Sequence, residues 1–427
     1  MTDAMRDNLL DALHHLSDAS QHLLSELRKK GSAWIVGGWV RDSMMGIRAE
    51  DMDIATTLTP DQIKSIFPRS IMVGASFGTV IVRLEDDELG SEWQVTTLRS
   101  EGDYSDGRRP DRVRFIEEGE DNANIIEDLG RRDFTINSMA VDINGNLIDP
   151  HDGLEDLAEG ILRTVGSAER RFGEDGLRVL RAFRFLDEGE TGIREMDKAL
   201  EMGIIQAGDF LSGVSRERVG VEISKILSGN NARKIALKMD IMGVLDRVFK
   251  GHKIDIPSEL SDNYLVNLAL FFRSQDISSV SLSELMRELL VLSKNELAEI
   301  SFLHDNRELK LDSSIESLRI FRAVIPEIRR NLILDYMEKS GIELLSFRNT
   351  LKKIEEEDLV ISPLISGDRL VEVTGLSPGP RLGKLKGRLH RNQIERGLKT
   401  EGEVISLLQD FDWAESNYED WKILQWP

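Results

Sequence analysis

The chain has 427 residues, enough for roughly two to four domains, and its 31% charged and 40% hydrophobic residues are ordinary for a soluble globular protein. It contains no cysteine, which excludes disulfides, thiolate metal ligands and thiol nucleophiles. The formal net charge of −21 argues against a protein that coats nucleic acid indiscriminately. No apolar run is long enough for a signal peptide or a membrane span, so we expect a cytoplasmic protein without membrane association.

The hydrophobic pattern divides the chain into a β-rich part and a long helical part. Leucines at three- and four-residue spacing predict a helix over residues 1–30. Strands are then predicted at 78–84, 93–99 and 112–116, and a helix is predicted to begin at Thr59. Beyond about residue 150 the spacing is helical. We therefore expect an α+β fold in which a small mixed sheet is followed by helical domains.

Two aspartates stand out in the stretch Trp34–Thr57, which reads as a strand, a Gly-Gly turn, a helical segment and a second strand. Asp51 and Asp53 are predicted to lie on that second strand, and alternation of side chains then points both the same way. A hard divalent cation relieves their repulsion, and Mg²⁺ keeps its other positions for water and phosphate. The pair predicts a two-metal site for phosphoryl or nucleotidyl transfer.

Residues suited to a polyphosphate precede this pair. Gly37 and Gly38 have no side chains, so their backbone can approach a triphosphate closely. Arg41 follows and can bind phosphate oxygens in a fork geometry. Alone, a D-x-D pair is usually a solvated strand end and a Gly-Gly pair only a turn. Their combination at this spacing is much more specific.

Further charged segments follow along the chain. The R-R-D triplet that begins at Arg131 is, by itself, most simply a surface ion pair. Phe172–Leu186 combines an apolar stripe with acidic and basic residues every three positions, which is equally typical of a helix with a solvated basic face. The dipeptide His151-Asp152 also occurs in HD phosphohydrolases, but no second histidine cluster is spaced to complete such a metal site.

A basic run near the C-terminus interrupts the acidic sequence. Between Arg381 and Lys399 the chain has seven Lys or Arg residues and one acid, Glu395. Such a run is usually a solvated helix face. Here a Gly- and Pro-rich turn precedes it and is predicted to leave backbone amides and Arg381 free for phosphate, as in recognition of an RNA duplex through its backbone. The predicted RNA contacts are Arg381, Lys384, Lys386, Arg388 and Arg391.

The order of these motifs resembles the class II tRNA nucleotidyltransferases and the bacterial poly(A) polymerases. R-R-D-F-T-I-N-x-M-A is matched almost letter for letter at Arg131–Ala140, and E-D-x-x-R at residues 174–178. D-P-x-x-G-x-x-D-L, which would be a hinge, lies at 149–157, and S-x-E-R-x-x-x-E, which would brace the nucleotide-selecting helix, at 215–222. The first signature is matched at Gly37, Gly38, Val40, Arg41, Asp42, Gly46, Asp51, Asp53 and Thr56.

This resemblance implies roles for residues of the head. Asp51 and Asp53 would be catalytic and would bind two Mg²⁺ ions. Arg132 would contact the triphosphate, Asp133 the ribose hydroxyl, and Asn137 would support the site. Gly37, Gly38 and Arg41 would belong to the same nucleotide site.

The resemblance also implies a protein template for the base. Asp175 and Arg178 would hydrogen-bond the Watson–Crick edge of CTP or ATP, because a carboxylate accepts from the amino group that cytosine and adenine share. Arg181 and Arg184 would face phosphates. The polar segment 99–112 would be the loop that switches the enzyme from C to A addition.

One position departs from the family pattern. Where most relatives have a third carboxylate before the V-T-T segment, this chain has Gln94. Glu92 is expected to reach the metals from the same strand face by a small shift; without it the site has two carboxylates and a reduced metal affinity.

The resemblance implies a polymerase-β-like nucleotidyltransferase head at 1–150, a nucleotide-selecting neck at 151–250, a helical body at 251–350 and a tRNA-binding tail at 351–427. The expected activity is template-independent addition of C, C and A to the tRNA 3′ end with release of pyrophosphate, with tRNA and not DNA as the partner. A poly(A) polymerase and a CC-only or A-only enzyme are the enzymatic alternatives. A non-enzymatic RNA-binding relative is less favoured, because the D-x-D and E-D-x-x-R positions are intact.

Overall fold

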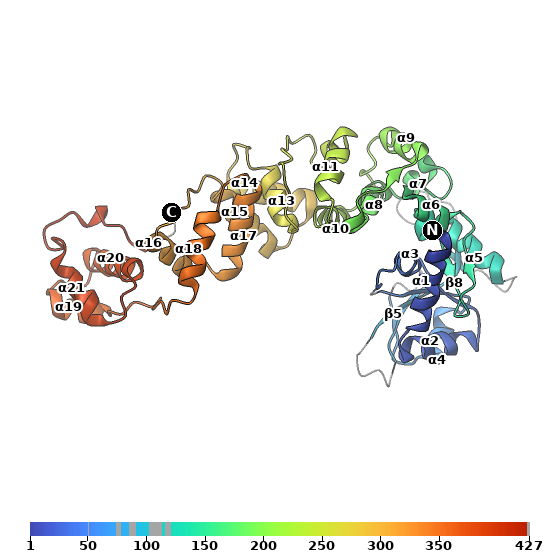
Figure 1. Ribbon diagram of the computed structural model, residues 1–427, viewed down its shortest axis with the longest axis horizontal. Helices are drawn as coiled ribbons and strands as arrows, with labels where there is room; N and C mark the ends of the chain where they lie inside the picture. Colours follow the sequence, from blue (N-terminus) through green and yellow to red (C-terminus); the bar gives the residue numbers. More distant parts are fainter. Residues whose placement is uncertain (50, 74–77, 85–90, 102–112, 116–120, 425–427) are drawn as a thin grey trace. The chain divides into compact units, whose positions relative to one another are not determined.

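The computed structural model describes residues 1–49, 51–73, 78–84, 91–101, 113–115 and 121–424. It divides into two compact units, Met1–His252 with Leu289–Val291, and Lys253–Glu288 with Leu292–Pro427. The described strands lie in the first unit, and helices make up the regular structure of the second (Figure 1). The predicted α+β class is confirmed. The further division at about residues 150 and 350 stays a prediction.

A seven-stranded mixed sheet carries the N-terminal part of the first unit, in the order β3-β4-β5-β2-β1-β8-β9. β2 and β5 pair in parallel, and the other neighbours pair antiparallel. Apolar side chains of β1 and β2 pack on the helix α5, where Ile125 and Leu129 are fully buried. The strands are β1 Ala33–Val36, β2 Asp53–Thr56, β3 Ile71–Met72, β4 Thr79–Val82, β5 Trp93–Thr97, β8 Ala140–Val141 and β9 Leu147–Ile148.

Two strand predictions were wrong in their bounds. The second strand begins at Asp53, so Asp51 lies just before it. The physical reason is that β1 ends at Val36, which pairs with Asp53, and the chain then turns away at Gly37 with φ +72°. The strand predicted over 93–99 is split at Leu98, which is buried in the core, and β6 Arg99–Glu101 pairs instead with β7 Val113–Phe115 in a separate sheet. Most of the predicted switching loop, residues 102–112, lies outside the described residues.

The helices of the first unit follow the predicted spacing, with two interruptions. The helix predicted over 1–30 is broken, because the side chain of Ser17 accepts the N–H of Ser20 and starts a new helix. The segment Phe172–Leu186 is broken at Asp175 and Gly176. The helices are α1 Thr2–His14, α2 Asp18–Arg28, α3 Gly38–Met44, α4 Pro60–Ile66, α5 Asp121–Gly130, α6 Gly153–Glu159, α7 Ala168–Glu174, α8 Leu177–Leu186, α9 Lys198–Gln206, α10 Arg216–Leu227, α11 Ala232–Ile241 and α12 Val244–Val248. A short parallel pair, β10 Ile161–Leu162 and β11 Glu195–Met196, lies among them.

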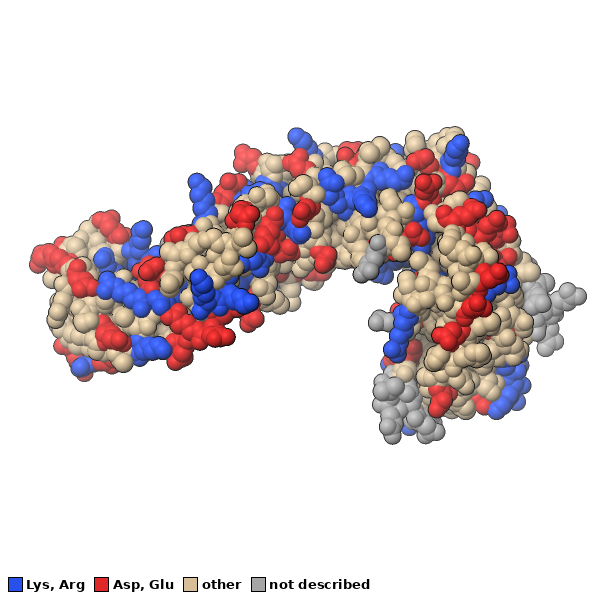
Figure 2. Space-filling model, viewed as in Figure 1, with Lys and Arg blue, Asp and Glu red and all other residues tan. Residues whose placement is uncertain are grey.

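The second unit has two hydrophobic cores, one built around Phe321 and Tyr336 and one around Leu385 and Trp421. No helix among the described residues is long and apolar enough to cross a membrane. On the face seen in Figure 2, acidic and basic side chains are interspersed over both units. The remaining helices are α13 Tyr264–Phe271, α14 Ser279–Leu290, α15 Lys294–Asp305, α16 Ile315–Val324, α17 Glu327–Lys339, α18 Leu345–Glu355, α19 Gly367–Thr374, α20 Pro380–Arg396 and α21 Glu401–Ser406.

Candidate active site

A cavity of about 1200 Å³ gathers most of the predicted site residues of the first unit. It is lined by the start of α3, by the first residues of β2 and β5, by the segment 131–137, and by α8 and α10. Among the described residues, ten Arg and Lys and seven Asp and Glu line it, so the cavity has an excess of positive charge in a chain of net charge −21. Such a cavity favours a polyanionic ligand.

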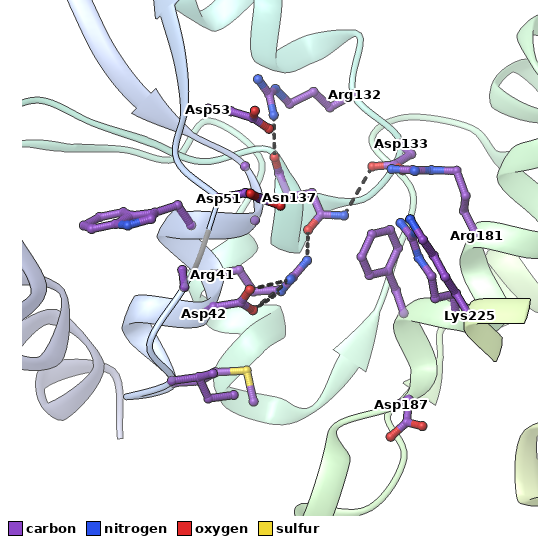
Figure 3. Close-up of a pocket in the computed structure, with 18 of the residues that line it drawn as sticks. Arg41, Asp42, Asp51, Asp53, Arg132, Asp133, Asn137, Arg181, Asp187 and Lys225 are labelled. Carbon is purple, nitrogen blue, oxygen red and sulfur yellow. Dashed lines mark hydrogen bonds and ion pairs between the residues drawn. The ribbon is translucent and has the colours of Figure 1, made fainter. Parts of the chain in front are cut away.

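Two carboxylates form one edge of this cavity (Figure 3). Asp53 is the first residue of β2, and Asp51 precedes it by two residues. Asp53 is exposed, but the protein atoms around its carboxylate partly desolvate it and raise its pKa above the usual value; Arg132 opposes this rise and Asp51 adds to it. Among the described residues no group of three or more His, Asp or Glu side chains gathers where it could hold a metal. A cation bound by this pair has further positions for water and substrate oxygens.

Gln94 occupies the position beside this carboxylate pair where the family pattern has a third carboxylate. The parallel pairing of Ile54 with Val95 brings Gln94 next to Asp53, and Gln94 lines the cavity. The carboxylate of Glu92 accepts from the Nε of Arg83 at 2.7 Å, and it is absent from the described lining of the cavity. Glu92 is thus paired with Arg83 at a half-exposed position, and the expectation that it reaches the metals by a small shift stays a prediction.

Gly37 has φ +72°, a left-handed conformation that favours glycine. A Cβ atom at this position would also lie 2.7 Å from Nη1 of Arg132, at the end of that flexible side chain. The Gly37 N–H donates to the carbonyl of Met139 at 3.2 Å, so this donor is already engaged by the protein. Burial lowers the pKa of Arg132, while Asp128 opposes that change. Nη1 of Arg132 donates to the Asn137 carbonyl at 3.3 Å, and its buried Nε has no hydrogen-bond partner among the described residues.

The residues predicted to contact ribose and phosphate form one hydrogen-bonded network (Figure 3). Asp42 accepts two hydrogen bonds from Arg41, at 2.8 and 2.9 Å, and Arg41 also donates to Oδ1 of Asn137 at 2.5 Å. Nδ2 of Asn137 donates to Asp133 at 3.4 Å, and Arg181 donates to the other oxygen of Asp133 at 2.7 Å. Burial alone would raise the pKa of Asp133, but Arg181 outweighs it and the pKa lies below its usual value. Asp133 is thus ionised and held in place.

The two residues predicted to read the base both line the cavity but have different partners. Asp175 lies between α7 and α8, and its carboxylate accepts from Arg218 of α10 at 2.6 Å. Arg178 donates to Glu174 at 2.5 Å and to the Arg131 carbonyl at 3.2 Å. Glu174 is buried and is also bound by another arginine of α7. Within the E-D-x-x-R motif the glutamate is therefore structural, and the aspartate faces the cavity.

Some cavity residues were not identified as site residues from the sequence. Arg218 was predicted to be only a brace, yet it lines the cavity and holds Asp175. Lys225 and Phe185 line it too. Helical spacing could have identified Lys225, because it follows Glu222 by one turn of α10. Glu222 itself pairs with Arg184 at 3.3 Å, as the predicted bracing role requires. The sequence carries no signal for Phe185, because its role depends on segments distant in the chain.

The motif at 149–157 is held by hydrogen bonds and close packing, and its role as a hinge stays a prediction. The two carboxylate oxygens of Asp149 accept the N–H groups of Gly153 and Leu154 at 2.8 and 2.9 Å, which caps the start of α6. A Cβ atom at Gly153 would lie 2.3 Å from the carbonyl of Thr135, whose hydroxyl donates to Asp156 at 2.6 Å. The motif fastens α6 to the R-R-D-F-T segment.

The predicted RNA-binding residues of α20 are largely engaged by the protein itself. Arg381 is not free, because three of its five N–H donors go to the carbonyls of Trp413, Ala414 and Ser416 at 2.7 to 3.0 Å. Its contact with RNA phosphate stays a prediction. The segment that follows α21 folds back on α20, which the sequence pattern did not indicate. Other contacts include Arg391 with Glu395 at 2.9 Å and with the Ile423 carbonyl at 3.3 Å, and Lys384 with Glu419 at 3.7 Å. Arg388 lies over the rings of Phe411 at 4.0 Å and Trp421 at 5.9 Å.

Comparison with known proteins bears on the family. Residues 33–163 match the poly A polymerase head domain, and residues 195–255 match the probable RNA and SrmB-binding site of polymerase A. The CCA-adding enzyme of Lactococcus lactis subsp. lactis is 32% identical over 393 residues, 87% of this chain and 92% of that protein. The chain belongs to the CCA-adding enzyme family. The CCA-adding enzyme of Bacillus licheniformis is 44% identical over 211 residues, 49% of this chain and 50% of that protein.

Solved structures of CCA-adding enzymes have the same fold. The Bacillus stearothermophilus enzyme in complex with CTP superposes with a TM-score of 0.73 at 24% identity, covering 92% of this chain and 98% of that one. The Thermotoga maritima enzyme complexed with tRNA_CCA gives 0.65 at 22% identity, covering 94% and 97%. The predicted fold, a nucleotidyltransferase head followed by helical domains, is confirmed.

Proposed function

We propose that this member of the CCA-adding enzyme family adds C, C and A to the 3′ end of tRNA without a nucleic-acid template. It uses CTP and ATP and releases pyrophosphate. The observation that carries the proposal is that one cavity combines the Asp51 and Asp53 edge with a wall of arginines suited to a triphosphate. A cytoplasmic location belongs to the same proposal and fits a chain without cysteine.

The donor set at the edge fits Mg²⁺, because carboxylate and amide oxygens are hard ligands and no nitrogen or sulfur donor is among them. Asp51 and Asp53 would hold two ions, with Gln94 beside them. When bound, these ions lower the pKa of the attacking hydroxyl and neutralise charge on the departing pyrophosphate.

The protein's own groups align the reactants for in-line attack. The 3′ oxygen of the RNA forms a bond to the α-phosphorus as the bond from that phosphorus to the α,β-bridging oxygen breaks. Pyrophosphate departs with the bridging oxygen, and the hydroxyl proton passes to solvent water. Arg132 and Arg41 lie beside the carboxylate edge and bind the triphosphate. Asp133, kept ionised by Arg181, accepts from the ribose hydroxyl. Fixed charges of this kind stabilise a phosphoryl-transfer transition state without reorganising during the reaction.

Selection of the base is assigned to Asp175 and Arg178. A carboxylate has about four lone-pair positions, so Asp175 can accept from Arg218 and from the amino group of cytosine or adenine together. Guanine and uracil present a carbonyl at the corresponding position and are rejected, because two acceptors then face each other.

The surface of α20 is proposed to contact the tRNA backbone. Fewer of its basic residues are assigned to that contact than the sequence predicted. Lys386 has no ion pair or hydrogen bond among the described contacts and is the best-placed cation. Lys384 has one ion pair, with Glu419, and Arg388 lies over the rings of Phe411 and Trp421. Phosphate can replace these contacts. Arg381 supports the fold of this surface.

The test is incubation of the purified protein and Mg²⁺ with tRNA truncated before its CCA end, with CTP, ATP or both, and resolution of products at single-nucleotide length. We expect three additions that stop, with C first. Two C, one A or an unbounded A tail would instead identify a CC-only enzyme, an A-only enzyme or a poly(A) polymerase.

Matched variants sharpen that test. Asp53→Asn is expected to abolish addition, whereas Asp61→Asn, an exposed aspartate in the first turn of α4, leaves it unchanged. Bound tRNA without any addition by the wild-type protein would overturn the proposal in favour of a non-enzymatic RNA-binding relative.

A further inference from the structure

Three arginines of the cavity surround one aromatic ring. The guanidinium carbon of Arg184 lies 4.4 Å from the ring centroid of Phe185, and those of Arg41 and Arg181 lie 5.2 Å from it. All three distances are within the range of a cation–π interaction. Arg41 comes from α3 and the other two from α8, so the ring joins segments that are far apart in the sequence.

Carboxylates pair with these guanidiniums as well. Arg41 pairs with Asp42, Arg181 with Asp133, and Glu222 pairs with both Arg184 at 3.3 Å and Arg181 at 3.8 Å. None of these carboxylates contacts all three cations. Phe185 is the contact that all three share. Its electron-rich face is attractive to cations, which offsets the mutual repulsion of like charges at close range.

The ring is itself held in place. Phe185 is half-buried and packs edge-to-face on Phe134, with ring centroids 5.7 Å apart and an interplanar angle of 69°. Phe134 is fully buried in the R-R-D-F-T segment. A ring anchored in this way cannot follow one arginine away from the others without leaving its packing.

The three guanidiniums keep donors for a ligand. Each has five N–H donors, and the hydrogen bonds and ion pairs among the described residues engage three on Arg41, three on Arg181 and one on Arg184. All three residues line the cavity. Their remaining donors can therefore bind the oxygens of a single polyphosphate.

We propose that Phe185 is a positioning residue for the triphosphate: it gathers Arg41, Arg181 and Arg184 so that they bind one polyphosphate chain together. This inference rests on the proposed function and extends it to a residue that touches no substrate atom. It requires that loss of the ring weakens binding of CTP, ATP and inorganic tripolyphosphate by the same factor. The base is read elsewhere, by Asp175, so base selectivity stays unchanged.

The experiment compares Phe185→Leu with Phe185→Tyr in the full-length protein. Leucine keeps an apolar side chain of similar bulk but removes the ring, and tyrosine restores it. Phe249→Leu is the matched control, because Phe249 is fully buried in the first unit and is not a lining residue of the cavity. Affinity for tripolyphosphate, CTP and ATP is measured by calorimetry without RNA, and thermal unfolding is followed by circular dichroism.

We expect Phe185→Leu to weaken all three ligands about tenfold, the factor that about 1.4 kcal/mol represents, with Phe185→Tyr and Phe249→Leu within about twofold of wild type. The ratio of CTP to ATP affinity should stay constant. Unchanged tripolyphosphate affinity in Phe185→Leu would overturn the inference, as would a loss in CTP and ATP binding that spares tripolyphosphate. Calorimetry reads binding alone, so these outcomes are distinct from a failure of the truncated tRNA to be extended.

Discussion

The break between α7 and α8 depends on Gly176, which packs directly against the backbone of Phe210. Gly176 has φ −60°, a conformation open to any residue, but a Cβ atom there would lie 1.8 Å from the carbonyl oxygen of Phe210 and 2.8 Å from its carbon. Both partners are main chain, so the two segments must separate by more than an ångström in Gly176→Ala. Overpacking of a rigid site costs about 1–3 kcal/mol, and we expect this variant at the upper end, about 3 kcal/mol. Because Gly176 follows Asp175 directly, the same displacement should reduce nucleotide addition.

The matched control lies three residues earlier. Gly173 is inside α7, and a Cβ atom there meets nothing within 4 Å. Gly173→Ala should gain up to about 1 kcal/mol from helix propensity, so the two alanine variants should differ by about 4 kcal/mol in the free energy of unfolding. Urea unfolding followed by circular dichroism measures both, and addition is assayed at a temperature where both are folded. A difference below about 1 kcal/mol would show that the 210 segment is not held firmly against Gly176 and would refute the packing argument.

Other variants test the charges of the site and the tail. Gln94→Glu places a third carboxylate beside Asp53 and should lower the Mg²⁺ concentration needed for half-maximal activity; a metal titration with an unchanged requirement would contradict this. Asp53→Asn should raise the free energy of unfolding at neutral pH in the absence of metal, because the raised pKa of Asp53 means that its ionised carboxylate destabilises the folded state. This gain should disappear as the pH falls below the ordinary pKa of 3.8, where the carboxyl group is protonated in both states. Asp133→Asn should do the reverse: the depressed pKa of Asp133 gives stability above its ordinary pKa that is lost as the pH falls, so urea titrations at several pH values should show a loss at neutral pH and none in acid. Arg381→Leu should lower the unfolding midpoint of the tail, whereas Lys386→Ala should leave it unchanged and weaken tRNA binding with a smaller salt dependence.

The clearest discrepancy between sequence and structure concerns arginines. Spacing placed Arg178, Arg181 and Arg184 correctly on one side of α8, and all three line the cavity. It did not show which of their donors the protein already uses. Arg381 was predicted to bind phosphate, yet three carbonyls of the C-terminal segment take its donors. An arginine can be identified from the sequence as a candidate phosphate ligand. The backbone carbonyls that bind it instead lie some thirty residues away, and the sequence does not reveal them because every residue type has a backbone carbonyl.

The sequence by itself determined the α+β class, the family signatures and the carboxylate pair, because these depend on periodicity and short-range spacing. The tertiary structure decided the rest. Parallel pairing of β2 with β5 put Gln94 beside Asp53, and Glu92 was paired with Arg83. The packing of α3 against the R-R-D-F-T segment and α8 assembled Arg41, Asn137 and Asp133 into one network. Such contacts join residues that are up to 96 positions apart, and only a folded chain fixes which of its many charges meet.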